Sequence, residues 1–454
     1  MLPNGDDGMA ASLEHMRTLT YVHHGVTVHE HRFAVPLDHF ASVSQGSETI
    51  EVFARELVRD GGERLPHLVF LQGGPGGQGP RQGDLTSGWI GAALKDYRVV
   101  LLDQRGTGLS TRLDAQSLAD LPSDQARADR VALFRQDQII ADAEVVREEL
   151  TGGAPWTTLG QSYGGFLTLT YLSMAPQGVA ASMLTGGLPG LVGIDDIYHL
   201  TYERTAARNR AHFARHPEDE QTIREVCAHL RDTEERLPTG ERLSPTRFRM
   251  IGMGLGMQTR TDLLHYLLEG PWVSVRGEKR LSEAFLDAVW ADVQMAPMYG
   301  VLQESIYAGA TPALVEAAAP TNWSAERLAR HTPGFVPDAD PLDTTEPYYL
   351  TGEHMMRAVF EEDPHLRPLL GTTDLLAERT DWRPVYLPEV LAQTSTPVTA
   401  AVYYDDMFVP RELSLDTAAQ IRGARVWVTN EYQHDGVRAS GGRVFERLHA
   451  MLTD

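Results

Sequence analysis

The chain has little cysteine, no long apolar run and a deficit of positive charge. Its 454 residues include one cysteine, Cys227, so no disulfide can form within the chain and the fold does not depend on an oxidising compartment. No apolar run approaches the length of about 18 residues that a membrane-spanning helix needs. Neither H-E-x-x-H nor a pair of C-x-x-C motifs is present, so we expect no metal and no cofactor.

Acidic residues outnumber basic ones, with 62 Asp and Glu against 40 Lys and Arg and a formal net charge of −22. Such a surface repels phosphate backbones and anionic lipids, so we expect neither nucleic acid nor a membrane as a partner. The charge is compatible with substrates that carry a free amine, although acidity also serves solubility alone. The first seven residues lack the basic and apolar regions of a signal peptide, which predicts a cytoplasmic protein.

Apolar patterning predicts an α/β protein with a mostly parallel sheet. Segments 26–35 and 49–57 alternate apolar and polar residues, which is typical of an antiparallel strand pair. The runs at 67–71 and 98–102 are continuously apolar, as expected for parallel strands buried on both faces. Further strands are predicted at 156–159, 181–185, 397–404 and 424–429, and helices at 137–150, 166–172 and 442–452.

Helical patterning dominates the middle of the chain, where strand-like runs are few. We therefore predict one α/β core, formed by residues 1–190 and 386–454, and an inserted helical cap domain at 191–385. A cap at the carboxyl edge of the sheet would cover a site there and shape its pocket. The first dozen residues are expected to be frayed, and Cys227 is expected to lie buried in a cap helix.

The sequence G-Q-S-Y-G-G at 160–165 follows a predicted strand and precedes a predicted helix. This is the setting of a nucleophile elbow, in which a sharp turn exposes the serine hydroxyl. Side chains at positions 160 and 164 would crowd that turn, so glycine is expected there. The pattern predicts Ser162 as a nucleophile.

A serine nucleophile needs a base, and the base needs a carboxylate to orient it. Asp405 and Asp406 follow the strand predicted at 397–404, and His434 follows the next strand. Residues at the carboxyl ends of neighbouring strands can meet the serine, in the chain order Ser, Asp, His of elbow-type hydrolases. Spacing does not choose between the two aspartates.

A glycine-rich turn, Q-G-G-P-G-G at 72–77, follows the strand predicted at 67–71. It lacks the Gly-Lys-Ser/Thr ending of a phosphate-binding P-loop and the G-x-G-x-x-G spacing of a dinucleotide site. We instead predict an oxyanion hole formed by the backbone N–H groups of Gly74 and Tyr163.

With the segment D-Q-R-G-T-G-L-S at 103–110, these motifs resemble the proline iminopeptidase (prolyl aminopeptidase) family of α/β-hydrolases, in layout its longer actinobacterial-type members. The similarity covers about 20–190 and 395–454 and is weaker in the cap. It implies the α/β-hydrolase fold with a cap, Ser162 as nucleophile and His434 as base. It favours Asp406, because the family's aspartate lies four residues before a proline. Gln72 replaces the histidine usual in the family.

The resemblance also implies cap glutamates that bind the substrate's free amine. Glu304 matches a Glu-x-x-Tyr segment of the family, and Glu353 is the candidate for a second such residue. A buried pair of carboxylates is costly alone and is relieved by a cation, whereas each could instead be a surface glutamate. Tyr307, Phe360 and Trp382 are candidates for an apolar pocket around a proline ring, although most such residues are expected to be ordinary core.

These features together predict a serine aminopeptidase that releases an N-terminal proline, or another small residue, from peptides through an acyl-enzyme. A carboxylesterase or amide hydrolase of the same fold is the alternative, and a non-catalytic binding protein with this fold is a more remote one. The sequence indicates no oligomeric state.

Overall fold

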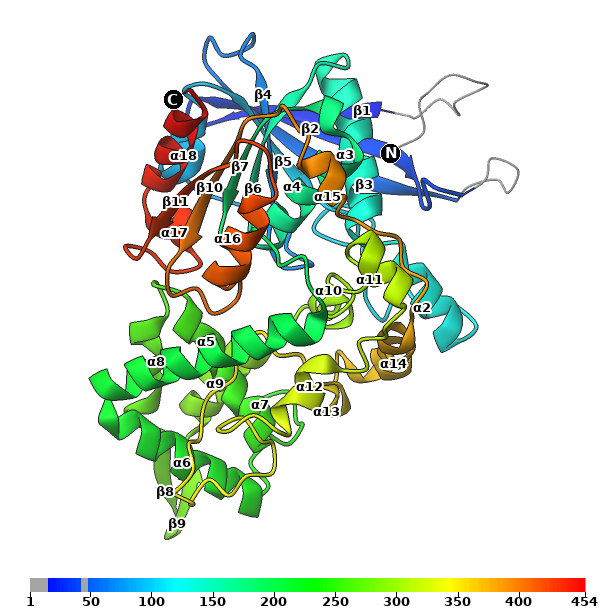
Figure 1. The fold of residues 1–454 in the computed structure, drawn as a ribbon. Helices are drawn as coiled ribbons and strands as arrows, with labels where there is room; N and C mark the ends of the chain where they lie inside the picture. Colours follow the sequence, from blue (N-terminus) through cyan, green and yellow to red (C-terminus); the bar gives the residue numbers. More distant parts are fainter. Residues whose placement is uncertain (1–14, 42–47, 454) are drawn as a thin grey trace.

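The computed structural model describes residues 15–41 and 48–453, and these form a nine-stranded sheet with helices on both faces and a helical cap at one end (Figure 1). The strand order is β1-β2-β3-β5-β4-β6-β7-β10-β11. Neighbours from β1 to β5 are antiparallel, and all neighbours from β5 to β11 are parallel. The strands are β1 His15–His23, β2 Val26–Pro36, β3 Thr49–Arg59, β4 His67–Leu71, β5 Arg98–Asp103, β6 Trp156–Gln161, β7 Val179–Thr185, β10 Val398–Tyr403 and β11 Arg425–Thr429.

The central strand β4 shows why its sequence is apolar from Leu68 to Leu71. Leu68 and Phe70 belong to one core, which they share with helices α1 (Gly88–Ala93) and α18 (Arg443–Thr453). Val69 and Leu71 point to the opposite face and join the core with α3 (Gln136–Thr151) and α4 (Tyr163–Met174). Because successive side chains alternate between two buried faces, positions 68–71 are all apolar, and the one polar residue, His67, stands at the start of the strand and pairs with Glu56.

The predicted core elements are confirmed, with ends that differ by a few residues. The antiparallel pair at 26–35 and 49–57 is β2 and β3, and the predicted parallel strands all occur. Strand β1 was not predicted from the sequence. Its Leu19 and Val22 are exposed, so these apolar residues do not mark a buried face. It is held by backbone pairing with β2. The predicted frayed segment lies outside the described residues.

The regular elements between β7 and β10 are helices, as the patterning indicated, apart from a hairpin of β8 (Trp272–Val275) and β9 (Glu278–Leu281), and long irregular segments such as 330–356 connect them. Figure 1 shows these helices together beyond the carboxyl ends of the parallel strands. The domain limits at 190 and 385 stay a prediction. The helices of this cap are α5 Ile194–Arg215, α6 Pro217–Asp232, α7 Pro245–Arg249, η3 Met250–Gly256, α8 Thr261–Leu268, α9 Glu283–Val293, α10 Pro297–Leu302, α11 Pro312–Ala317, α12 Ser324–Ala329, α13 Arg357–Glu362, η4 Arg367–Leu369 and α14 Leu370–Glu378.

The remaining helices belong to the core segments. Cys227 is buried in α6, as predicted. None of the helices in the described residues combines the length and apolar character needed to traverse a bilayer. The other helices are α2 Asp124–Ala132, η2 Pro176–Gly178, α15 Pro388–Leu391, α16 Arg411–Ala419 and α17 Gly436–Ala439.

The cap is fastened to the core at the loop that carries His434. The carboxylate of Asp435 accepts hydrogen bonds from the backbone N–H groups of Gln258 and Thr259 in the cap and from the Thr259 hydroxyl. The N–H of His434 itself donates to the carbonyl oxygen of Gly256, at 3.2 Å. The loop after β11 therefore contacts the cap on two successive residues.

Candidate active site

Ser162 occupies the sharp turn between β6 and α4. Its φ of 56° and ψ of −127° lie in a region that non-glycine residues rarely adopt, which is the strained backbone of a nucleophile elbow. A Cβ on Gly160 would overlap the carbonyl oxygen of Gly164, and a Cβ on Gly164 would overlap that of Leu71. The close approach of backbone to backbone explains why both flanking positions are glycine.

His434 and Asp406 form a buried pair beside this turn. The Nδ1 atom of His434 lies 2.8 Å from Oδ2 of Asp406. The other oxygen of Asp406 accepts from the N–H groups of Phe408 and Val409, which fixes the carboxylate. Asp406 is 1% exposed, whereas Asp405 is exposed at the surface. The geometry therefore pairs His434 with Asp406 and leaves Asp405 outside the site.

The glycine-rich loop lies directly against Ser162. A Cβ on Gly73 would come within 2.9 Å of the Ser162 Cβ, and Gly74 has a φ of 133°, which favours glycine. Tyr163 is the first residue of α4, so its N–H has no acceptor within the helix. The glycine-rich loop and the first turn of α4 therefore meet at Ser162, and the oxyanion hole stays a prediction.

Residues 103–110 support the glycine-rich loop at 72–77 through hydrogen bonds. The carboxylate of Asp103 accepts from the N–H groups of Gly79 and Leu109, at 2.9 and 2.8 Å, and pairs with Arg81. Gln104 Nε2 donates to the carbonyl oxygen of Gln72 at 2.9 Å. Both ends of the loop are therefore tied to the end of β5, which gives the 103–110 segment a structural role next to the serine.

A cavity of about 360 Å³ joins these groups to the cap. Ser162 and His434 line it, together with the glycine-rich loop and Glu353. The Tyr299 hydroxyl donates to Oε1 of Glu353 at 3.0 Å. A carboxyl group therefore lies in the same cavity as the serine and the histidine.

Burial dominates the acid–base properties of the cavity. It raises the pKa of Glu353 to about 7, against the smaller opposing effects of His434 and the Tyr299 hydrogen bond. Burial alone would lower the pKa of His434, but the charge and hydrogen bond of Asp406 outweigh it and the pKa is raised. In the free protein near neutral pH, Glu353 is thus poised between its neutral and charged forms.

Comparison with known proteins agrees with this geometry. A model of the α/β hydrolase fold matches residues 66–247. A proline iminopeptidase from Aeromonas sobria is 40% identical over 441 residues, which cover 96% of this chain and 99% of that protein. This chain belongs to the proline iminopeptidase family. A second member, from Aspergillus aculeatus, is 30% identical over 438 residues, or 94% of this chain and 93% of that protein.

Among solved structures, an acetylester hydrolase from Corynebacterium glutamicum is 12% identical, with a TM-score of 0.42, and the match covers 93% of this chain and 95% of that one. The two proline iminopeptidases confirm the family resemblance of the sequence motifs. The family's usual histidine at position 72 is replaced by Gln72, whose Oε1 accepts from Arg438 Nη2 at 3.2 Å.

Glu304 lies deeper in the cap than Glu353. It is 7% exposed, and Oε1 accepts from the N–H of Ala325 at 3.2 Å. Burial raises its pKa to about 7, against weaker opposing hydrogen bonds. Glu304 is not among the described residues that line the cavity. It nevertheless lies near Tyr198, whose pKa is raised by burial first and then also by the charges of Glu304 and Glu353. Glu304 is buried and Glu353 lines the cavity, so neither is an ordinary surface glutamate.

The apolar lining of the cavity differs from the sequence prediction. Phe360 packs on Trp323 and Trp382 lies under the guanidinium of Arg135, so both belong to the cap and core packing instead. Tyr307 is buried against Phe166. The apolar lining comes from Met253, Met257, Met295 and the ring of Tyr299. No local motif marks these residues, because they meet only when η3, α10 and the loop after α9 assemble.

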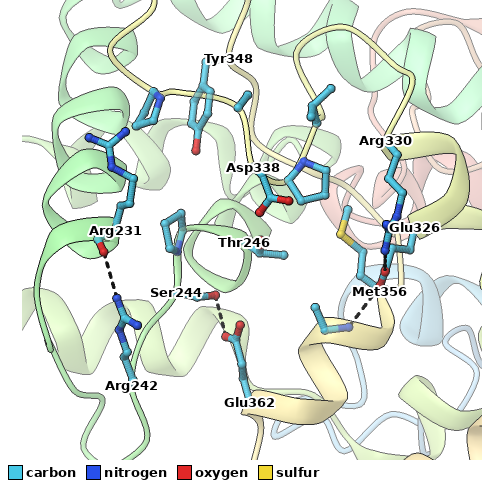
Figure 2. Close-up of a pocket in the computed structure, with 16 residues that line it drawn as sticks. Arg231, Arg242, Ser244, Thr246, Glu326, Arg330, Asp338, Tyr348, Met356 and Glu362 are labelled. Carbon is cyan, nitrogen blue, oxygen red and sulfur yellow. Dashed lines mark hydrogen bonds and ion pairs between the residues drawn. The ribbon is translucent and has the colours of Figure 1, made fainter.

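A larger cavity, of about 750 Å³, lies within the cap between α7 and α13 (Figure 2). Two contacts join polar side chains across its lining: the Ser244 hydroxyl donates to Glu362 at 2.6 Å, and Arg330 pairs with Glu326 at 2.7 Å. It contains no serine–histidine pair among its lining residues. The smaller cavity is therefore the candidate active site.

Proposed function

We propose that this protein is a serine aminopeptidase that releases an N-terminal proline, or another small residue, from peptides. The observation that carries the proposal is the position of Glu353, a half-buried carboxyl group in the same cavity as Ser162 and His434. A hydrolase of acylated substrates would gain nothing from a half-buried carboxyl beside the reacting bond. A substrate with a charged terminal amine gains a partner there.

The reaction would begin with acylation of Ser162. His434, oriented by Asp406 through Nδ1, takes the hydroxyl proton on Nε2 while the serine oxygen attacks the carbonyl carbon. The N–H groups of Gly74 and Tyr163 stabilise the negative charge that develops on the carbonyl oxygen. The carbon–nitrogen bond then breaks, and His434 gives its proton to the departing amine of the shortened peptide.

Water completes the cycle. His434 takes a proton from a water molecule, which attacks the acyl-enzyme, and then returns the proton to the Ser162 oxygen as the ester breaks. The free amino acid leaves with a new carboxylate. No group beyond the side chains and backbone of the cavity is required.

Substrate recognition follows from the energetics of the carboxyls. Ionisation of the half-buried Glu353 is unfavourable because the carboxylate is poorly solvated, and an incoming ammonium group would stabilise the charged form by pairing with it. Glu304, with a similarly raised pKa and close to Tyr198, is our candidate for the second carboxylate of the amine site. An acetylated N-terminus carries no charge and would not stabilise the ionised form of Glu353. Peptide substrates and a cytoplasmic location are part of the proposal.

The test compares proline arylamide with its N-acetyl derivative. Purified protein should hydrolyse the free-amine substrate, and Glu353→Gln should lower kcat/KM for that substrate by about 100-fold or more, since a charged hydrogen bond is replaced by a neutral one. Cleavage of a simple acetyl ester should change little in the same variant. Equal losses of activity on proline arylamide and on the acetyl ester would show that Glu353 does not recognise the amine. A preference of the wild type for the N-acetyl arylamide would favour an esterase or amide hydrolase.

A further inference from the structure

Three histidines surround one buried aspartate at the side of the cap where α5, α6 and α8 meet (Figure 1). His216 joins α5 to α6, Asp219 lies in the first turn of α6, and His265 comes from α8. One ligand atom from each of these three residues lies within 4.8 Å of the others. We propose that His216, Asp219 and His265 form a zinc-binding site, separate from the catalytic cavity.

Asp219 is held as a metal ligand would be. It is 1% exposed, and His265 Nδ1 lies 3.1 Å from Oδ1. The buried His212, from α5, places Nε2 2.7 Å from Oδ2. A hydrogen bond from His212 to Oδ2 leaves Oδ1 facing the other histidines. Such outer hydrogen bonds orient the carboxylate ligands of metal sites and preserve their geometry.

The two remaining ligands are accessible enough to adjust. His216 and His265 are half-buried, and their rings stack with centroids 3.9 Å apart. Ligand atoms around a tetrahedral zinc ion are about 3.3 Å apart, given zinc–nitrogen and zinc–oxygen bonds of about 2.0–2.2 Å. Rotation of the two imidazole rings toward Asp219 would bring the three atoms to that spacing, with no movement of the helices.

The chemistry of the ligands selects the ion. Two imidazoles and one carboxylate match the ligands of zinc, whereas calcium and magnesium prefer oxygen ligands throughout. Three protein ligands leave a fourth position for water. The sequence carries no short zinc motif because the third ligand lies 46 residues beyond Asp219 in the chain, on a different helix.

The position of the site links it to the cavity wall. Helix α8 begins at Thr261, directly after Met257 and Arg260, which line the catalytic cavity. Zinc bound by His265 would tie α8 to the corner between α5 and α6. The expected effect is therefore a more stable cap.

The experiment uses full-length protein without a histidine tag, treated with a chelator and then titrated with zinc by calorimetry. We expect one bound ion per chain, a higher thermal unfolding temperature with zinc, and the visible spectrum of four-coordinate cobalt when Co²⁺ replaces it. His216→Ala and His265→Ala should each weaken binding at least about tenfold. His199→Ala removes an exposed histidine from the same helix α5 and should leave binding unchanged.

Two further variants keep the result decisive. Zinc could also bind the catalytic imidazole, so the titration is repeated in a His434→Ala background, where the cap site should persist. Asp219→Asn keeps the shape of the side chain and removes its charge, and should weaken binding while circular dichroism shows an intact fold. Absence of binding at micromolar zinc, or binding that survives the loss of both His216 and His265, would show a cluster held by hydrogen bonds alone.

Discussion

Replacing Glu353 by glutamine should make the free protein more stable at alkaline pH. The half-buried Glu353 carboxyl lines the cavity, where loss of solvation raises its pKa to about 7 from an ordinary 4.5. Ionising it in the folded protein therefore costs about 3 kcal/mol more than ionising it in the unfolded chain. Glutamine avoids this cost, and its amide oxygen can still accept the hydrogen bond from Tyr299.

The effect has a defined dependence on pH. Below about pH 4.5 the carboxyl is neutral in both the folded and the unfolded states, so the cost is absent. Between pH 4.5 and 7 the unfolded chain loses the proton first, and the stability of the wild type falls relative to Glu353→Gln. Above pH 7 the difference reaches its full value and stays constant.

Thermal unfolding of both proteins at pH 5.5 and pH 8 measures this difference. The midpoint of Glu353→Gln should exceed that of the wild type by several degrees at pH 8, and the gap should shrink at pH 5.5. Glu316→Gln is the matched control, because this cap glutamate is exposed on α11 and should give no gap at either pH. A gap that is the same at both pH values, or a variant less stable than the wild type at pH 8, would refute the reasoning.

Other substitutions test the core of the site. Ser162→Ala should lower kcat by at least about 10⁴-fold, with unchanged circular dichroism; residual activity close to the wild type would exclude the serine mechanism. Asp406→Asn should lower kcat by about 10⁴-fold in steady-state assays, whereas the exposed Asp405→Asn should remain near the wild-type value. A loss of activity in Asp405→Asn but not in Asp406→Asn would show that Asp406 is not the aspartate of the triad. Gly164→Ala should cost about 3 kcal/mol or more in denaturant unfolding, because its Cβ overlaps a backbone oxygen, while Gly193→Ala, with open space around it, should cost little.

Local signals in the sequence were sufficient for the core of the molecule. A parallel strand buried on both faces, such as β4, is apolar along its central positions, and a nucleophile elbow must place glycines where backbone meets backbone, so both leave short patterns. The choice between Asp405 and Asp406 is different. It depends on which carboxylate turns inward to the N–H groups of Phe408 and Val409, and that turn is not encoded by spacing.

The cap left weaker signals because its functional side chains converge from separate segments. Met253, Met295 and Tyr299 line one cavity but belong to η3, to the loop after α9 and to α10. Each resembles an ordinary core residue in its own helix. Burial of Glu353 is likewise a property of the assembled cap, since its own segment, 351–355, has no regular structure.

The contacts of Asp435 and His434 with the cap link the position of the cap to the position of the His434 imidazole. A cap displaced from the core would release Gly256 from the His434 N–H and Gln258 and Thr259 from Asp435. The imidazole would then lose part of its backbone support just as the cavity opened to solvent. The cap therefore helps to hold the imidazole of His434 in place as well as to cover the cavity.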